Sequence, residues 1–173
     1  MLSEKMQTAL NAQINAEFHA SYLYLAMAAY FEYENLPGFA NWMHVQSDEE
    51  RMHAMKFYGF VNDRNGRVLL RAIDQPKTEW AAPLEVFEAA FAHESKVTGM
   101  INNLVDLAMS ERDHASNSFL QWFVDEQVEE LQVVDAVIQD LKRVGDSPQG
   151  LFLLDRELGA RSAAGAAADA AGE

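Results

Sequence analysis

The apolar residues of this chain recur at three- and four-residue steps through four long segments, the spacing of one buried helix face. Turn-forming residues separate the segments, with "NLPG" after the first and "NG" after the second. The predicted helices span about 3–34, 38–65, 83–111 and 115–144, with a short fifth over "GLFLLDREL", 150–158. We therefore expect an all-α protein.

The connections between these helices limit how they can be arranged. Most are short, which makes successive helices antiparallel neighbours, but 67–83, "RVLLRAIDQPKTEWAAP", is long enough to run the length of a bundle. A growth-factor-type bundle needs two such crossovers, so we expect a four-helix bundle with one long crossover and a short fifth C-terminal helix. This domain would cover 1–158, followed by an Ala/Gly-rich disordered tail over 159–173.

Charge and composition narrow the classes of function. Asp and Glu number 27 against 13 Lys and Arg, and the formal charge of −14 repels phosphate backbones and attracts cations. The chain has no cysteine, which excludes disulfides and thiolate metal sites. Because the sequence shows no secretory signal and no apolar run long enough to span a bilayer, we expect a cytoplasmic protein that binds neither nucleic acid nor membrane.

Each of the four long helices carries metal-ligating residue types near the middle of its apolar face. These residues are Glu17, Glu50 with His53, Glu94, and Gln127 with Glu130. Packed side by side, the helices would bring them to one level in the core, where crowded carboxylates cannot all stay ionised without cations. Oxygen ligands and one imidazole suit iron or manganese. A bridging carboxylate, for which Glu50 is the central candidate, would hold two ions close together.

Several neighbouring residues are open to two interpretations. Tyr24 lies on the same face as Glu17, and Trp122 lies near the predicted site. Either could supply an electron, although packing in the core is the favoured role. Three further acids are rotated off the apolar faces and are either solvated or part of an adjoining cation site: Glu49, Glu126 and Glu129.

Four stretches of the chain resemble the bacterial non-haem ferritins. They are "NAEFHASYLYLAM", "DEERMHAMKF", "HE" at His93 and Glu94, and "FLQWFVDEQVEEL", and the resemblance covers about 1–158. It implies a ferritin-like fold and a homo-oligomeric, hollow 24-subunit cage. Each subunit would act as a ferroxidase, oxidising iron(II) with O2 or H2O2 at a dinuclear centre, and the cage would store the product as ferric oxyhydroxide.

The resemblance also assigns roles by position. Glu17, Glu50 and His53 would bind the first iron, with Glu50 bridging; Glu94 and Glu130 would bind the second, with Gln127 beside it. The third iron site of bacterial members would be formed by Glu49, Glu126, Glu129 and Glu130. Tyr24 and Trp122 match the aromatic residues near the centre, and the fifth helix matches the one that packs around the four-fold axes.

Two departures from other ferritins set further expectations. Haem-containing bacterioferritins carry a second Glu-x-x-His where this chain has Gln127 and Glu130, and their haem-binding methionine stands where Arg51 is found. We therefore expect no haem. Animal ferritins line their three-fold channels with acids where this chain has Asn117 and Leu120, so the route of iron entry stays open.

Other functions also remain open. A di-iron or di-manganese peroxidase or catalase could use the same ligand types. A DNA-protecting mini-ferritin is less favoured, because its ligands lie at a subunit interface and its tail is usually cationic, whereas the tail here has no lysine. A plain helical interaction protein would bind no metal tightly.

Overall fold

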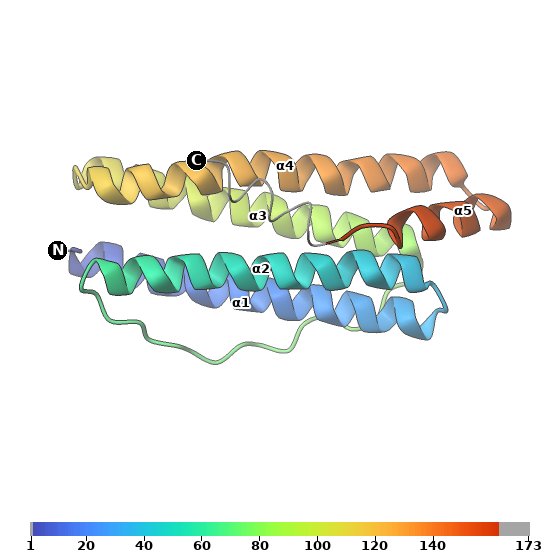
Figure 1. Ribbon diagram of the computed structural model, residues 1–173, viewed down its shortest axis with the longest axis horizontal. Helices are drawn as coiled ribbons and strands as arrows, with labels where there is room; N and C mark the ends of the chain where they lie inside the picture. The colour runs from blue at the N-terminus through green and yellow to red at the C-terminus, as the bar shows by residue number, and fades with distance from the viewer. Residues whose placement is uncertain (1, 163–173) are drawn as a thin grey trace.

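The computed structural model describes residues 2–162, which form five helices (Figure 1). Their bounds are α1 Glu4–Tyr33, α2 Pro37–Asp63, α3 Pro83–Ser110, α4 His114–Val144 and α5 Pro148–Leu158. Within the described range there is no strand. The predicted all-α fold, with four long helices and a short fifth, is confirmed, and the helix ends fall within a few residues of the predicted positions.

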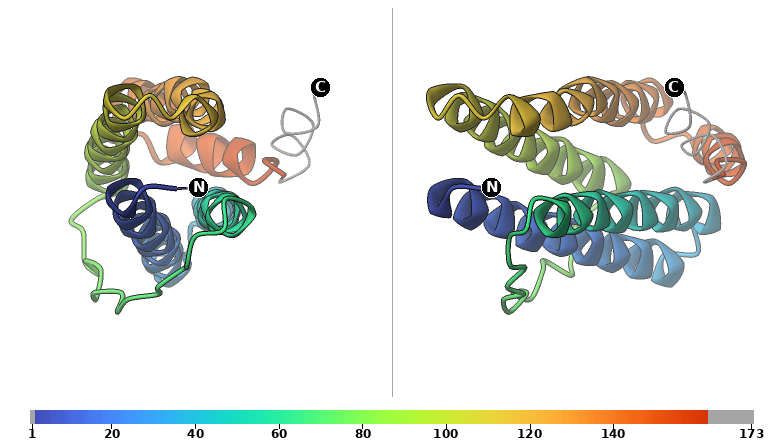
Figure 2. Two further views of the ribbon diagram at one scale, coloured as in Figure 1. Left: turned by 90° about the vertical axis from the view of Figure 1, so that its left-hand side faces the viewer. Right: turned by 60° about the vertical axis from the view of Figure 1, so that its left-hand side comes forward.

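The long helices form a bundle of two antiparallel pairs. α1 pairs with α2 and α3 with α4, as the end-on view shows (Figure 2). The connection from α2 to α3 runs back along the outside of the first pair for the length of the bundle (Figure 1). α5 lies at the end where α2 begins and α4 ends, and contacts both. The single long crossover is therefore also confirmed.

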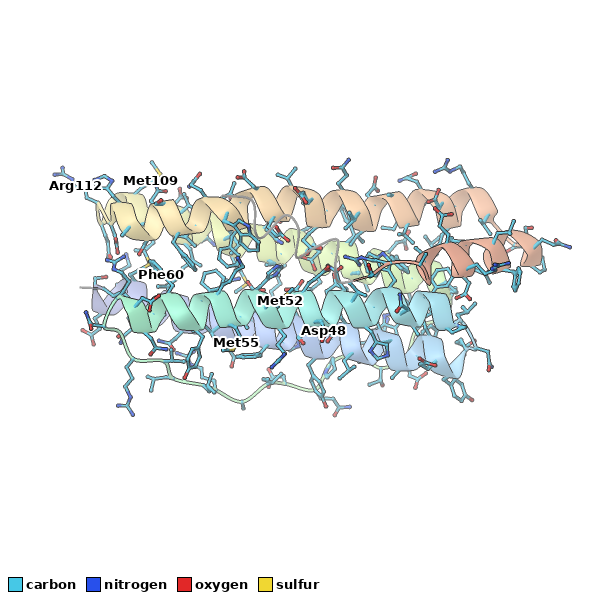
Figure 3. All side chains as sticks on the ribbon, in the orientation of Figure 1. Asp48, Met52, Met55, Phe60, Met109 and Arg112 are labelled. Carbon is cyan, nitrogen blue, oxygen red and sulfur yellow. The ribbon has the colours of Figure 1, made fainter. Side chains whose placement is uncertain are left out.

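Three of the turns between helices share one backbone device. In each, the residue two positions after the last helical residue has the left-handed conformation, and these residues are Asn35, Asn65 and Arg112, with φ of 57°, 56° and 57°. The next N–H then reaches back to the last turn, as where Gly66 N–H donates to the Val61 carbonyl at 2.8 Å. Arg112 lies at the α3–α4 end of the bundle in Figure 3. This conformation ends each helix and turns the chain within a few residues.

Side-chain amides of α1 hold the crossover against the bundle. The Asn11 amide donates to the Arg67 carbonyl at 3.0 Å and accepts from the Leu69 N–H at 2.6 Å. Gln7 Oε1 accepts from the Arg67 N–H at 2.8 Å. These bonds satisfy backbone N–H and C=O groups of the crossover, which lies outside the helices and therefore lacks their internal hydrogen bonds.

The apolar core consists of two clusters. The cluster near α5 includes Phe31, Phe39 and Phe87. The cluster at the opposite end includes Phe57 and Phe123, whose rings stack with centroids 4.1 Å apart. The positions between the two clusters along the helices are those of the predicted metal ligands. The core therefore has a polar layer in its middle.

α5 is fastened to the first turn of α2 by one carboxylate. Asp155 Oδ1 accepts from the backbone N–H groups of Gly38 at 2.8 Å and Phe39 at 3.1 Å, so it occupies donors that a helix start leaves unpaired. The α5 backbone lies so close that a Cβ added at Gly38 would be 1.6 Å from the Asp155 carbonyl oxygen. Only glycine fits there.

None of the helices in the described range combines the length and apolar character that crossing a membrane requires. The tail predicted over 159–173 lies outside the described residues from residue 163 onward, so its disorder stays a prediction. Residues 159–162 are described and run from the end of α5 back along α2.

Candidate metal centre

The polar layer contains all six of the ligands predicted at mid-helix. They come from α1, α2, α3 and α4, and they are Glu17, Glu50, His53, Glu94, Gln127 and Glu130. None of them is more than 6% exposed. The structure thus places them in the interior of the chain's helical bundle, as the apolar stripes of the sequence predict.

Glu17, Glu50 and His53 form the tightest group. Each offers a ligand atom, and these atoms lie within 4.8 Å of one another. Glu50 and His53 share a face of α2 because they are three residues apart, and His53 Nδ1 lies 3.3 Å from Glu50 Oε2. Glu17 meets them from α1.

Two carboxylate oxygens of this group have no hydrogen-bond donor among the described atoms: Glu17 Oε2 and Glu50 Oε1. A buried acceptor without a donor carries its full desolvation cost, about 1–3 kcal/mol. A cation bound between these oxygens would remove that cost. The donor set of two carboxylates and an imidazole therefore fits a divalent metal ion.

A second group shares the same imidazole. His53, Glu126 and Glu130 also offer ligand atoms within 4.8 Å of one another, and His53 Nε2 lies 3.6 Å from Glu126 Oε1. Both ring nitrogens of His53 therefore face carboxylates. His53 stands between two candidate cation positions, one deep in the bundle and one nearer the half-buried Glu126.

The remaining carboxylate at this level, Glu94, is held by other side chains. The Tyr24 hydroxyl donates to Glu94 Oε1 at 2.5 Å, and the Gln127 amide donates to Glu94 Oε2 at 3.2 Å. Within the described residues Glu94 belongs to neither of the two groups. Its expected pairing with Glu130 at a second iron stays a prediction.

Two buried amides that the sequence interpretation did not assign to the site also hold its carboxylates. Gln13 Nε2 donates to Glu17 Oε1 at 2.8 Å, and Gln46 Nε2 donates to Glu130 Oε2. Each amide lies one helical turn before an acid of the site on the same face of its helix. For Gln13 that spacing is the signal that could have identified its role, whereas the acid that Gln46 bonds lies on another helix.

Burial shifts the protonation of the whole layer. It raises the pKa of Glu94 to about 8 and that of Glu130 to about 7, and it raises the pKa of Glu50 well above its ordinary value with help from the charge of Glu94. Although burial lowers the pKa of His53, hydrogen bonds to Glu126 and Glu50 raise it well above its ordinary value. The metal-free centre therefore holds protons near neutral pH, and a divalent cation would take their place.

The model of the ferritin family, a ferritin-like domain, matches residues 7–144. The chain belongs to the ferritin family. It is 46% identical over 162 residues to a bacterial non-heme ferritin of Staphylococcus saprophyticus, covering 94% of this chain and 97% of the relative. The corresponding protein of Staphylococcus aureus is 43% identical and covered to 98%.

Solved structures lead to the same ferritin family. An open pore ferritin from the hyperthermophilic archaeon Archaeoglobus fulgidus superposes with a TM-score of 0.93 at 49% identity, covering 94% of this chain and 100% of that one. An engineered closed form of the same archaeal ferritin gives the same TM-score. The predicted family and the ferritin-like fold are confirmed.

The outer acids of this ferritin-family chain take three different positions. Glu49 is buried and forms an ion pair with Arg161 at 2.7 Å. Glu126 faces His53, whereas Glu129 is exposed and belongs to neither ligand group in the described range. Whether these acids form a third ferritin iron site stays a prediction.

The two aromatic residues lie beside the layer, as their spacing predicts. Tyr24 contacts Glu94 directly, and the Trp122 ring lies edge-on to His53 with centroids 5.5 Å apart. Lys56 Nζ is 3.8 Å from the centre of the Trp122 ring. Neither position distinguishes an electron donor from a packing residue.

Proposed function

We propose that this protein is an iron-storing ferroxidase. The observation that carries the proposal is the pair of buried, donor-less carboxylate oxygens of Glu17 and Glu50 beside His53. Iron(II) is the substrate and dioxygen or hydrogen peroxide is the oxidant. The names of the relatives, bacterial non-heme ferritins, support iron as the cation and the lack of haem. A cytoplasmic location stays a prediction.

The residues of the layer prepare the substrate for electron transfer. Glu17, Glu50 and His53 bind one iron(II), and Glu50 reaches a second ion that Glu94 and Glu130 hold. As the ions bind, these side chains release the protons that burial makes them keep. Two iron(II) ions then give one electron each to dioxygen, which takes up two protons and leaves as hydrogen peroxide. The ferric ions are stored as oxyhydroxide inside a cage of 24 copies.

The position of the ligands argues against a mini-ferritin. The candidate ligands come from four helices of one chain and face the interior of that chain, whereas a mini-ferritin site needs residues from two subunits. The layer therefore supports a centre within each subunit.

The test combines oxidation with storage. Iron(II) added aerobically to the metal-free protein should be oxidised and retained in particles that elute as a cage and contain an electron-dense iron core. Glu50→Gln and His53→Ala should lower the initial rate by at least about tenfold while the cage still assembles. Asp48→Asn is the matched control, because Asp48 is exposed on α2 and shares its side with the exposed Met52 and Met55 (Figure 3).

Two results would refute the proposal. Unchanged initial rates in both Glu50→Gln and His53→Ala would show that oxidation occurs elsewhere. Rapid release of oxygen from hydrogen peroxide without retained iron would instead identify a catalase.

A further inference from the structure

The chain beyond α5 places one guanidinium against the side of α2 that faces the metal centre. Arg161 Nη1 donates to Gln46 Oε1 at 2.7 Å, and Nη2 donates to Glu49 Oε2 at 2.7 Å. The guanidinium carbon lies 4.4 Å from the centre of the Trp42 ring. These three partners are one to two turns apart on α2, so they form one continuous binding surface for a planar cation.

The backbone at this point is fixed as well. The Asn41 amide donates to the Arg161 carbonyl at 2.9 Å, and the Arg161 N–H donates to the Leu158 carbonyl at 3.2 Å. The side chain of Arg161 is 24% exposed, so the contact is largely withdrawn from water. Arg161 is therefore held from both its main chain and its side chain.

The contact reaches a candidate metal ligand through one amide. A guanidinium can only donate hydrogen bonds, so the Gln46 oxygen faces Arg161 and the Gln46 NH2 group faces Glu130. Arg161, Gln46 and Glu130 thus form a chain from the C-terminal segment to the polar layer. The amide transmits no charge, but it fixes the Glu130 carboxylate.

The second partner, Glu49, is one of the acids that the family resemblance would place at a third iron site. Its side chain is 6% exposed and lies close enough to Glu126 and His53 for their charges to act on it. Arg161 supplies the positive charge that a buried carboxylate requires. Arg161 occupies Oε2 of Glu49, so a divalent ion that took both oxygens of this carboxylate would have to displace the guanidinium.

We propose that Arg161 is the resident cation of the outer acid cluster, defined as Glu49 and Glu126, and that it competes with a divalent metal ion for Glu49. The inference rests on the proposed function, since it concerns an ion additional to those of the inner centre. Arg161 acts as a positioning residue: while it is seated, Glu49 points at the guanidinium, and the outer ion binds only as the guanidinium leaves. The segment after α5 thereby sets the affinity of the outer site.

Zinc(II) titration of the assembled, metal-free, full-length protein tests the competition. Calorimetry should resolve strong binding at the inner centre from a weaker outer step. Arg161→Gln should tighten the outer step by on the order of tenfold, the effect of removing one charge-assisted hydrogen bond. Arg156→Gln is the matched control: Arg156 is exposed on α5 and has no ion pair within residues 2–162. An outer step equal in the parent and Arg161→Gln proteins would overturn the inference.

A double-variant cycle separates competition from a general loosening of the structure. Glu49→Gln removes the carboxylate for which Arg161 and zinc compete. In that background, adding Arg161→Gln should therefore no longer tighten zinc binding. A gain of the same size in both backgrounds would show that Arg161 acts through something other than Glu49, and would refute the proposal.

Trp42 reports whether the guanidinium moves. In a Trp80→Phe, Trp122→Phe background Trp42 is the sole tryptophan, since the chain has three. Its emission should change during the outer zinc step in the protein with Arg161 and stay constant in that step after Arg161→Gln. Constant emission in both proteins would show that Arg161 stays on Trp42 while zinc binds, and would contradict the competition. If zinc failed to bind tightly to any variant, the proposed function itself would fail, and the inference with it.

Discussion

The Tyr24 hydroxyl donates a 2.5 Å hydrogen bond to Glu94, and both side chains have no exposed surface. Burial, together with the charge of Glu94, raises the pKa of Tyr24 well above its ordinary value, so the phenol keeps its proton and stays the donor. With Gln127 on the other oxygen, the Glu94 carboxylate is oriented from two sides before any ion binds. The hydrogen bonds of the protein, rather than a bound ion, therefore fix the position of the Glu94 carboxylate.

Tyr24→Phe should therefore disturb both stability and oxidation. The ring still fills its place in the core, but Glu94 loses a buried donor, which should cost about 1–3 kcal/mol of unfolding free energy. The initial rate of iron(II) oxidation should fall, because Glu94 is no longer fixed. Chemical denaturation of the metal-free protein and absorbance of the ferric product measure the two effects.

Tyr22→Phe is the control for that experiment. Tyr22 lies two residues away on α1, but it is 49% exposed and has no side-chain hydrogen bond within the described residues. It should behave like the parent protein. Equal stability and equal rates for Tyr24→Phe and the parent would contradict the positioning role of Tyr24.

The metal-free protein should lose stability as the pH rises from about 6.5 to about 8. Burial raises the pKa of Glu94 to about 8 and of Glu130 to about 7, whereas both carboxyls of the unfolded chain titrate near 4.5. In this window the folded state holds more protons than the unfolded state, so each unit of pH removes up to about 1.4 kcal/mol per proton. The raised pKa of His53 acts in the same direction. Below about 6.5 His93 opposes the trend, because burial lowers its pKa to about 4.

Thermal melts in the presence of a chelator would measure this slope. Glu94→Gln carries no titrating proton at that position, so its slope should be shallower. Zinc-loaded protein should lose the decline, because the ion replaces the protons. A melting temperature that rose over the same window would mean that the layer is ionised in the empty protein.

The sequence was sufficient to predict the fold and the location of the polar layer because both depend on periodicity. Glu17, Glu50 and Glu94 stand on otherwise apolar faces near mid-helix, and antiparallel packing of similar helices brings such residues to one level. The partners of these acids were harder to predict. Gln46 lies on α2 but bonds to Glu130 on α4, which depends on the packing between helices rather than on spacing within one.

Arg161 shows the same limit more clearly. It lies in a segment whose composition indicates a tail, and neither periodicity nor a local motif ties it to α2. Its contacts with Trp42 and Glu49 arise because α5 folds back onto the start of α2. Contacts that depend on where a short terminal helix docks leave no pattern in the sequence.

Asp113 joins the ends of two helices, and its loss should destabilise the bundle end far from α5. Its carboxylate caps α4 by accepting from Ser116 N–H at 3.1 Å and also pairs with Arg64 at 3.1 Å. Asp113→Ala should lower the unfolding free energy by about 1–2 kcal/mol, while Asp113→Asn, which can still cap, should lose less. Urea denaturation measures both; an Asn variant as unstable as the Ala variant would show that the charge, not the cap, is what matters.

Gly38→Ala should release α5 without unfolding the bundle. The added Cβ would meet the Asp155 carbonyl oxygen at 1.6 Å, and because that atom is backbone, α5 must move as a unit. The movement breaks the two bonds from Asp155 to the start of α2. If α5 packs around a four-fold axis, the cage should dissociate into smaller species on size-exclusion chromatography while α1–α4 keep their helical circular dichroism. Gly59→Ala is the control for Gly38→Ala. Gly59 lies on the same helix with nothing within 4 Å of an added Cβ, so the change should leave the cage intact and stabilise α2 by about 0.5–1 kcal/mol. Intact cages in both variants would mean that assembly does not depend on the docking of α5.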